Sequence, residues 1–242
     1  MVSACASDAG AAGIPYQELE AGVVKSGGDV SLELRGISKN YGRKSVLAEV
    51  SHTFTPGLTL LTGPSGAGKS TLLRMIATVE KPTRGDILWN GARLPAARGK
   101  LRTTLGYAPQ AVDLPEDLTA REFAMHMAAL KGLSLRAADK QFGAITDAIG
   151  LHADINNRIA SFSGGMRRRL IFAQALLGAR RVLALDEPTA ELDAETARKL
   201  GALLLERARD AIVVMTTHLA DELAPSAIAV LRVEAGMVAH SS

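Results

Sequence analysis

The segment Gly63–Ser70 carries the residue types and spacing needed to hold a phosphate group. It reads Gly-Pro-Ser-Gly-Ala-Gly-Lys-Ser and matches the GxxxxGK[ST] pattern of a phosphate-binding loop. Glycines let backbone N–H groups turn inward around an anion, and the helix that follows offers its positive N-terminus. We expect Lys69 to contact the β- and γ-phosphates of a nucleotide and the Ser70 hydroxyl to ligate Mg²⁺. A chance glycine-rich turn is the alternative, but the strand expected before the loop and the helix expected after it argue against that.

Two adjacent carboxylates, Asp186 and Glu187, form a second chemical feature directly after the apolar run 182–185. Such a pair at the end of a buried strand is costly unless a cation faces it. A magnesium-bound nucleotide in a neighbouring phosphate loop meets that need, so we expect Asp186 to hold Mg²⁺, directly or through water. Glu187 points the other way from the strand and is placed to accept a proton from an attacking water. Without the phosphate loop upstream, a solvated acidic turn would be the better interpretation.

Strands and helices that alternate along the chain are expected to position these groups. Three strands are predicted before the loop, from period-two patterns and one short apolar run at 30–34, 50–54 and 58–62. After the loop, a helix is predicted from apolar residues at helical spacing, Leu72, Leu73, Ile76 and Val79, with Pro82 at its end. Residues 85–91 predict a strand that ends in the turn pair Asn90-Gly91.

The second half of the chain begins with a helical pattern and then returns to alternation. From Leu118 to about Ala160 the sequence is alanine-rich, with apolar stripes at Phe123, Met127 and Leu130 and at Phe142, Ile145 and Ile149. A helix at 165–177, a strand at 182–185, a helix at 194–207 and a strand at 211–216 follow. This order predicts an α/β fold with a mainly parallel sheet covered on both faces.

Composition narrows the classes of function. The net charge of +3 does not by itself indicate a polyanionic partner, and no nucleic acid is expected. A basic run before residue 110 (Arg93, Arg98, Lys100 and Arg102) lacks interleaved aromatic residues and is interpreted as a solvated face. The single cysteine, Cys5, excludes a disulfide framework and a zinc site of several thiolates. No stretch approaches the roughly 18 apolar residues of a membrane span, so a cytoplasmic location is expected.

A third motif resembles a known family. Ser161–Leu170, which contains Ser163-Gly164-Gly165-Met166, is similar to the LSGGQ signature of ATP-binding cassette (ABC) ATPases. The other motifs of that family follow the expected order in this chain: an aromatic residue at Tyr41, the phosphate loop, a Q-loop at Gln110, the Asp186-Glu187 pair, a D-loop at Asp193 and a switch histidine at His218. The resemblance covers about Val30 to Val238.

The resemblance implies an architecture and a set of site residues. The fold would be a P-loop NTPase with an N-terminal antiparallel β part, a helical insert at about 115–165 and a single domain at 29–242, behind a disordered leader at 1–28. ATP and Mg²⁺ would be the cofactors. The resemblance assigns catalysis to Glu187, His218 and Gln110, and metal binding to Ser70, Gln110 and Asp186. The nucleotide would be held by Tyr41, Gly63, Pro64, Ser65, Gly66, Ala67, Gly68, Lys69, Ser70, Thr71, Ser163, Gly164, Gly165 and Asp193.

Cassettes of this family work as head-to-tail pairs, which implies a second copy or a similar cassette as partner. In such a pair Ser163 and Gly165 contact the γ-phosphate bound by the other subunit, and Asp193 lies at the interface. Three arginines (Arg167, Arg168 and Arg169) crowd the first turn of the expected helix, where the helix dipole disfavours cations. Nearby acids, a polyanion from the opposing subunit, or plain solvation are the alternatives. Met166 stands where the family usually has glutamine.

The function expected first is the ATP-hydrolysing subunit of an ABC transporter, bound to an integral membrane subunit at the inner face of the cell membrane. The sequence around Met166 also resembles drug or antibiotic exporters. The alternative is a soluble ABC-type ATPase that acts on nucleic acid or in protein assembly. No heptad run or cysteine module of such proteins is found between Lys69 and Ser163, which favours transport. A P-loop kinase would not need the Ser163 motif, and a non-hydrolysing sensor would not need Glu187.

Overall fold

The computed structural model describes residues 30–190, 192–217 and 220–240, so the leader expected at 1–28 lies outside the described residues. The strands are β1 (Leu32–Tyr41), β2 (Lys44–Phe54), β3 (Gly57–Thr62), β4 (Arg84–Trp89), β5 (Ala92–Arg93), β6 (Leu105–Ala108), β7 (Val182–Asp186), β8 (Ile212–Thr216), β9 (Ala229–Glu234) and β10 (Met237–His240). The α-helices are α1 (Lys69–Ile76), α2 (Arg98–Thr104), α3 (Ala120–Leu130), α4 (Leu135–Ala148), α5 (Gly164–Leu176), α6 (Ala194–Ala208) and α7 (Ala220–Leu223). None of these helices is long and apolar enough to cross a bilayer.

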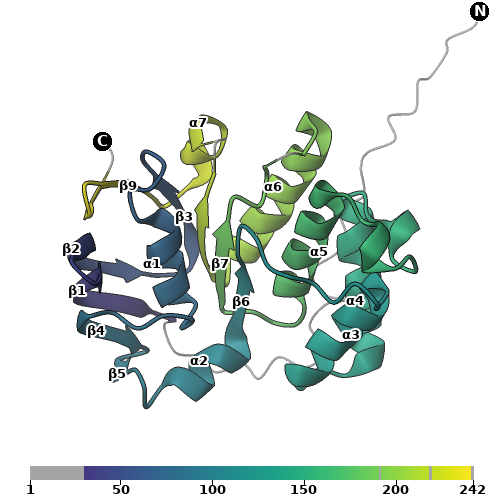
Figure 1. The fold of residues 1–242 in the computed structure, drawn as a ribbon, viewed down its shortest axis with the longest axis horizontal. Coiled ribbons are helices and arrows are strands. Elements are labelled where there is room, and N and C mark those ends of the chain that lie inside the picture. The colour runs from purple at the N-terminus through teal and green to yellow at the C-terminus, as the bar shows by residue number, and fades with distance from the viewer. Residues whose placement is uncertain (1–29, 191, 218–219, 241–242) are drawn as a thin grey trace, which may run out of the picture.

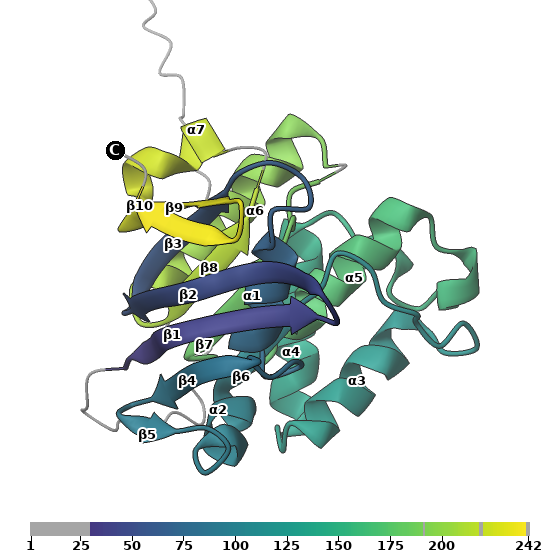
Figure 2. The same ribbon diagram turned by 60° about the vertical axis from the view of Figure 1, so that its left-hand side comes forward.

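The N-terminal sheet has the strand order β2-β1-β4-β5, and each neighbouring pair is antiparallel. Its inner face is apolar because Leu32, Leu34 and Ile37 of β1 are fully buried. The predicted Asn90-Gly91 turn joins β4 to β5, and both residues have positive φ, as a tight hairpin turn requires. Figure 2 shows this sheet lying across α1.

The core sheet has the order β10-β9-β3-β8-β7-β6, in which only β10 is antiparallel to its neighbour. Alternate residues of β7 and β8 face opposite layers. Val182 and Ile212 pack in the cluster that contains α1, whereas Leu183 and Val213 pack with α5 and α6. Because helices cover both faces (Figure 1), all residues of β7 and β8 are buried, as a parallel sheet between two helical layers requires. The predicted α/β class is confirmed.

The helical part differs from the prediction in one apolar stripe. Phe142, Ile145 and Ile149 are buried as expected, but Leu130 is 82% exposed. The buried face of α3 consists instead of small residues four apart, Ala120, Ala124 and Ala128. Small side chains allow α3 to pack closely against α4 and α5. Leu130, the last residue of α3, is left outside that contact.

Helix α1 is shorter than predicted. It ends at Ile76, before Pro82, and Val79 is 57% exposed rather than packed. Thr78 follows the helix with φ of 57°, a left-handed conformation that ends the helical path. The guanidinium of Arg102 holds this turn, because its Nε donates to Thr78 Oγ1 (2.9 Å) and its terminal nitrogen to Thr78 O (3.2 Å).

Candidate functional site

The phosphate loop, residues 63–70, connects the end of β3 to the start of α1. Gly63, Gly66 and Gly68 all have positive φ, at 123°, 76° and 111°. A Cβ on Gly63 would lie 2.0 Å from the carbonyl oxygen of Val233, so no other residue fits there without a shift. The glycines therefore allow the loop to curl back on itself at the end of a buried strand.

The N-terminus of α1 is free of negative charge. Gly68 is the N-cap, no side chain caps the helix, and its first turn has no acidic residue. The N-terminal N–H groups and the positive end of the helix dipole are thus directed at the loop. Lys69 adds an ammonium, whose Nζ donates to the carbonyl oxygens of Gly63 (2.7 Å) and Pro64 (2.9 Å). This arrangement suits a phosphate group.

Hydrogen bonds join the two carboxylate residues at the end of β7, Asp186 and Glu187, to Thr216 at the end of β8. Thr216 lies opposite Asp186 in the parallel register and donates through its hydroxyl to Asp186 Oδ1 at 2.7 Å. The same Oγ1 accepts a hydrogen bond of 2.8 Å from the backbone N–H of Glu187. Glu187 has φ of 51°, a strained conformation for a residue with a side chain. Thr216, which the sequence interpretation did not single out, thus holds both residues.

The donor set next to the phosphate loop fits Mg²⁺. Ser70 supplies a hydroxyl and Asp186, which is only 6% exposed, supplies a carboxylate. Helix α1 packs against β7 and β8, which brings the two elements that carry these oxygens together. Hard oxygen donors from one or two protein groups, completed by phosphate oxygens and water, are what magnesium sites in nucleotide-binding proteins use.

Tyr41, the residue expected beside an adenine ring, is 43% exposed at the end of β1. Its hydroxyl donates to the carboxylate of Glu80 and accepts from Arg74 at 3.2 Å, and the Nζ of Lys39 lies 5.0 Å from its ring centroid. Glu80 also accepts from Arg74 Nε at 2.6 Å. Partial burial raises the pKa of Glu80, but the hydrogen bonds from Tyr41 and Arg74 outweigh it and lower the pKa overall. The tyrosine ring is therefore anchored by its hydroxyl end.

The signature turn, which we define as residues 163–165, and the phosphate loop lie at the starts of two different helices, α5 and α1. Ser163 is exposed and caps α5 by accepting from the N–H of Met166 at 3.3 Å. A Cβ on Gly164 or Gly165 would meet no atom within 4 Å, so packing within the described residues does not require glycine there. Helix α5 packs on β6, β7, α3 and α4, whereas α1 packs on β7 and β8. Leu183 of β7 faces the α5 layer and Val182 the α1 layer, so the two helices lie on opposite faces of that strand.

Two arginines in the first turns of α5 have partners nearby, which offset the unfavourable interaction of cations with the N-terminal end of a helix dipole. Arg167 pairs with Glu116 at 2.8 Å, and Arg169 donates to the carbonyl oxygen of Gly150 at 2.7 Å. Gly150 lies two residues after the end of α4, next to its C-cap Ile149, and cations are favourable at the C-terminal end of a helix. Local groups therefore offset these two charges. Met166 is partly buried and packs on the core.

Three further candidate residues remain to be placed: Gln110, Asp193 and His218. Gln110 is exposed in the segment after β6. Asp193 is the N-cap of α6, where its Oδ1 accepts from the N–H of Thr196 at 2.9 Å. That hydrogen bond lowers the pKa of Asp193. His218 lies outside the described residues.

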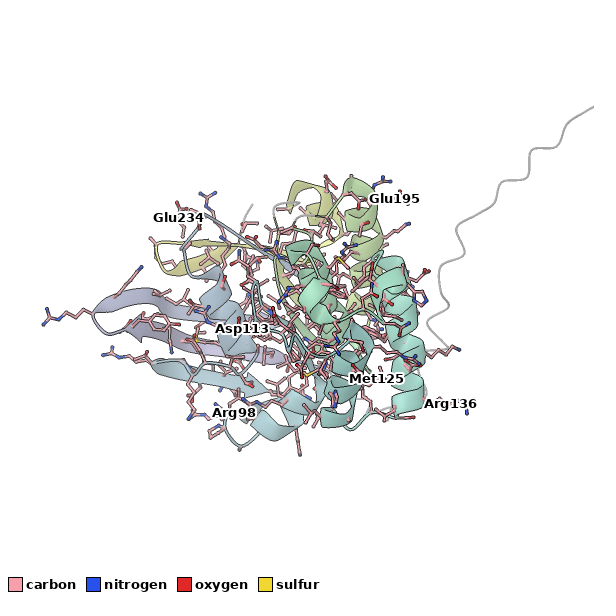
Figure 3. The ribbon with its side chains drawn as sticks, turned by 45° about the vertical axis from the view of Figure 1, so that its right-hand side comes forward. Arg98, Asp113, Met125, Arg136, Glu195 and Glu234 are labelled. Atoms are coloured by element: carbon pink, nitrogen blue, oxygen red, sulfur yellow. The ribbon has the colours of Figure 1, made fainter. Side chains whose placement is uncertain are left out.

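An apolar cavity of about 420 Å³, which we call the α3 groove, lies between β6, the segment 109–114, α3 and α5. Phe123 and Met127 form part of its wall, and Asp113, labelled near the middle of Figure 3, also lines it. Lys131 also lines it, and its Nζ donates to the backbone and side-chain oxygens of Gln174. Burial, reinforced by the charge of Arg180, lowers the pKa of Lys131 to about 7.

Comparison with known proteins gives matches over most of the chain. The profile of the family described as "ABC transporter" matches residues 47–190. The chain is 35% identical over 204 residues to a Nod factor export ATP-binding protein I of Sinorhizobium fredii, an alignment that covers 82% of this chain and 58% of that protein. It is 38% identical over 165 residues to a human phospholipid-transporting ATPase, covering 68% of this chain and 10% of that protein. The chain spans about three fifths of the length of the Nod factor export relatives.

Solved structures agree with these matches. An ATP-binding subunit of an ABC transporter superposes with a TM-score of 0.79 and 27% identity, covering 87% of this chain and 89% of that chain. A bacterial ABC transporter cassette in its dimeric form superposes with a TM-score of 0.77 and 26% identity, covering 86% of this chain and 96% of that chain.

Proposed function

Because this chain belongs to the ABC transporter family as an ATP-binding cassette, we propose that it hydrolyses ATP to drive a separate membrane-spanning partner. One observation carries the catalytic part of this proposal. The phosphate loop, Asp186 and Glu187 converge at the carboxyl ends of the parallel strands β3, β7 and β8, with Thr216 fixing both acids. The carboxyl ends of such strands are where α/β proteins bind their ligands.

Each group at this edge of the sheet has a role in the proposed reaction. The loop N–H groups and Lys69 hold the phosphates, while Ser70 and Asp186 supply oxygens to Mg²⁺. Bound Mg²⁺ would neutralise charge on the phosphate oxygens. Glu187 accepts the proton of the attacking water. Gln110 and His218 keep the roles that the family resemblance implies, as contacts to the water, the metal and the γ-phosphate.

We propose a head-to-tail pair as the active form. The exposed signature turn has room in front of its two glycines, so a phosphate held by a second cassette can approach the backbone closely. The N-terminus of α5 supplies N–H groups there, with Ser163 at the cap. The dimeric cassette among the solved relatives supports this arrangement.

The α3 groove is the surface we assign to the membrane-spanning partner. It is mostly apolar, and one wall is formed by the 109–114 segment, which contains Gln110. A segment seated in the groove would therefore touch the stretch that leads from the nucleotide site to the helices. With such a partner the chain would lie on the cytoplasmic face of the membrane. The relatives named for Nod factor export support an exporter, without identifying the substrate of this chain.

Glu187→Gln tests the catalytic assignment. We expect this variant to bind ATP as tightly as the parent protein, to lose nearly all ATP turnover and to accumulate as an ATP-bound dimer. Lys69→Ala should instead lose affinity for ATP, because it removes the ammonium from the loop. Phosphate release and size-exclusion chromatography with ATP measure these outcomes. Turnover of Glu187→Gln at the parent rate would show that another group is the base.

Purification of the native protein tests the transport assignment. Recovery with an integral membrane subunit supports it. Recovery with nucleic acid or ribosomes, and no membrane subunit, would favour the alternative of a soluble ABC-type ATPase. Cross-links from residue 112, placed in the α3 groove, should reach the membrane subunit, whereas cross-links from Arg136 on the exposed start of α4 should not.

A further inference from the structure

A second cavity, of about 180 Å³, lies between the turn after α1, the start of β4 and the segment that leads into α2. We call it the Arg98 cavity. Much of its wall is apolar, formed by Pro82, Ile87, Leu94 and Pro95. An apolar cavity of about 150 Å³ takes up one benzene molecule. The Arg98 cavity is therefore large enough for one small ring or one short branched chain.

Arg98 brings a positive charge to this cavity. It is the first residue of α2 and lines the cavity, at the lower edge of the molecule in Figure 3. Its Nε atom is buried and has no hydrogen-bond partner among the described residues. Buried polar groups in native proteins nearly always have a partner, and a buried guanidinium nitrogen without one is costly. An anion in the cavity would offset part of that cost by placing a negative charge beside the guanidinium.

The two carboxylates of the cavity wall already have cationic partners, so they repel a bound anion less than free carboxylates would, without cancelling the attraction of Arg98. Asp86 pairs with Arg93 at 3.4 Å. Glu80 accepts hydrogen bonds from Tyr41 and Arg74, and it pairs with Lys39 at 3.2 Å. Lys81 adds an exposed cation at the rim. Arg98 and Lys81 are thus the two cations of the lining that can face a bound anion, and Arg98 is the one with a buried nitrogen that lacks a partner among the described residues.

We infer that the Arg98 cavity binds a small organic carboxylate, with the apolar part inside the cavity and the carboxylate on Arg98. Occupation of the cavity also reaches the nucleotide site, because Glu80 lines the cavity and holds Tyr41 and Arg74. Arg74 in turn donates to Thr71 Oγ1, in the first turn of α1, at 3.1 Å. A bound carboxylate repels Glu80, loosens Tyr41 and lowers the affinity for ATP. This second step rests on the proposed function, whereas binding of the carboxylate does not.

Benzoate is the probe for the site, and benzamide is its uncharged match in shape. In calorimetric titrations without nucleotide, we expect benzoate to bind at least about tenfold more tightly than benzamide, because only benzoate makes the charge-assisted hydrogen bond. Arg98→Gln should weaken benzoate binding to the level of benzamide, and Arg98→Lys should restore part of it. Lys100→Gln, which removes an exposed cation of the same helix, should change nothing.

Three results would overturn the site: no binding at about 10 mM benzoate, equal binding of benzoate and benzamide, or unchanged binding in Arg98→Gln. Leu94→Trp provides a second test that does not touch the charge, because a larger ring fills the cavity. It should abolish binding of both compounds, and full binding by a folded Leu94→Trp would also overturn the site. Thermal melting establishes that each variant is folded.

The coupling is measured separately, as the affinity for a fluorescent ATP analogue with and without saturating benzoate. We expect benzoate to weaken analogue binding about fivefold in the parent protein, and not at all in Arg98→Gln. Linkage requires the analogue to weaken benzoate by the same factor. Unchanged analogue affinity would overturn the coupling. Failure of the analogue to bind even without benzoate would instead contradict the proposed function.

Discussion

The hydroxyl group of Thr216 contacts both acids of the site. It donates to Asp186 and accepts from the N–H of Glu187, and Thr216 is only 1% exposed. Thr216→Val removes the hydroxyl but keeps the volume, which leaves the Glu187 N–H without that acceptor. We expect kcat for ATP hydrolysis to fall at least about tenfold, with stability reduced by about 1–3 kcal/mol.

Thr216→Ser is the matched control, because it keeps the hydroxyl and loses only a methyl group. It should retain most of kcat, and both variants should bind ATP without Mg²⁺ at parent affinity, since the phosphate loop is untouched. Steady-state ATPase assays and urea unfolding curves give the two readouts. Equal kcat in Thr216→Val and the parent protein would show that the hydrogen-bond chain does not position Glu187.

At the scale of residues, the functional positions that can be predicted from the sequence are those that lie together in one contiguous motif. Gly63, Gly66 and Gly68 form such a pattern, and each has the positive φ that its role in the loop requires. Thr216 has no local signal of that kind. Its importance depends on the register that places it opposite Asp186 across two strands, thirty positions apart in the chain. A polar residue at the last position of an apolar strand is the signal that would have identified it.

At the scale of an element, one residue, Asp193, stabilises the N-terminus of helix α6. Asp193 caps it, and hydrogen bonds from Thr196 lower the pKa of that carboxyl. Asp193→Ala should lower Tm by about 2–4 °C, whereas Asp193→Asn should keep the cap and most of the Tm. Because the folded pKa lies below the unfolded one, the difference between parent and Asp193→Asn should be largest near neutral pH. It should disappear as the pH falls through the folded pKa.

A dimerisation assay distinguishes the capping role of Asp193 from the interface role that the family resemblance implies for it. If Asp193 acts only as a cap, the double variant Glu187→Gln/Asp193→Asn should form the ATP-dependent dimer as well as Glu187→Gln alone does. A loss of dimer with an unchanged Tm would assign Asp193 to the interface. Analytical ultracentrifugation with ATP distinguishes the two.

At the scale of elements, long and strongly patterned segments were predictable. The helix predicted at 165–177 and the strand predicted at 182–185 differ from α5 and β7 by one residue at their ends. Short elements were missed, among them α2, β5 and β10, because too few residues repeat to show a period. Val79 was misassigned because its spacing fits a helix, whereas the left-handed Thr78 ends that helix before it.

At the scale of the whole molecule, the sequence does not reveal which charges become buried together. Lys131 looks like an ordinary surface lysine in the sequence. In the fold, α3 and α5 enclose it beside Gln174, and Arg180 acts on it from the same region. Gln174 also donates from its Nε2 to the carbonyl oxygen of Tyr107 at 3.0 Å, so the lysine connects α3 through α5 to β6. This connection forms one wall of the α3 groove.

The lowered pKa of Lys131, about 7, makes the stability of the whole domain depend on pH. Below pH 7 the lysine is charged in both the folded and the unfolded state, and the full cost of burying the ammonium is present. Between pH 7 and the unfolded pKa of about 10.5, the unfolded chain binds more protons than the folded protein, so stability rises with pH. The rise attributable to Lys131 is up to about 2 kcal/mol between pH 7 and 9.

Lys131→Met removes this contribution while keeping an unbranched side chain of similar length. Urea unfolding of the parent and the variant across pH 6–9 should show the variant gaining stability relative to the parent at the acidic end, with the gap closing toward pH 9. Lys100→Met, at an exposed position, should run parallel to the parent throughout. Parallel curves for Lys131→Met and the parent would mean that the ammonium keeps its ordinary pKa because the two oxygens of Gln174 compensate for its burial. The α3 groove would then present a full positive charge to its partner at neutral pH.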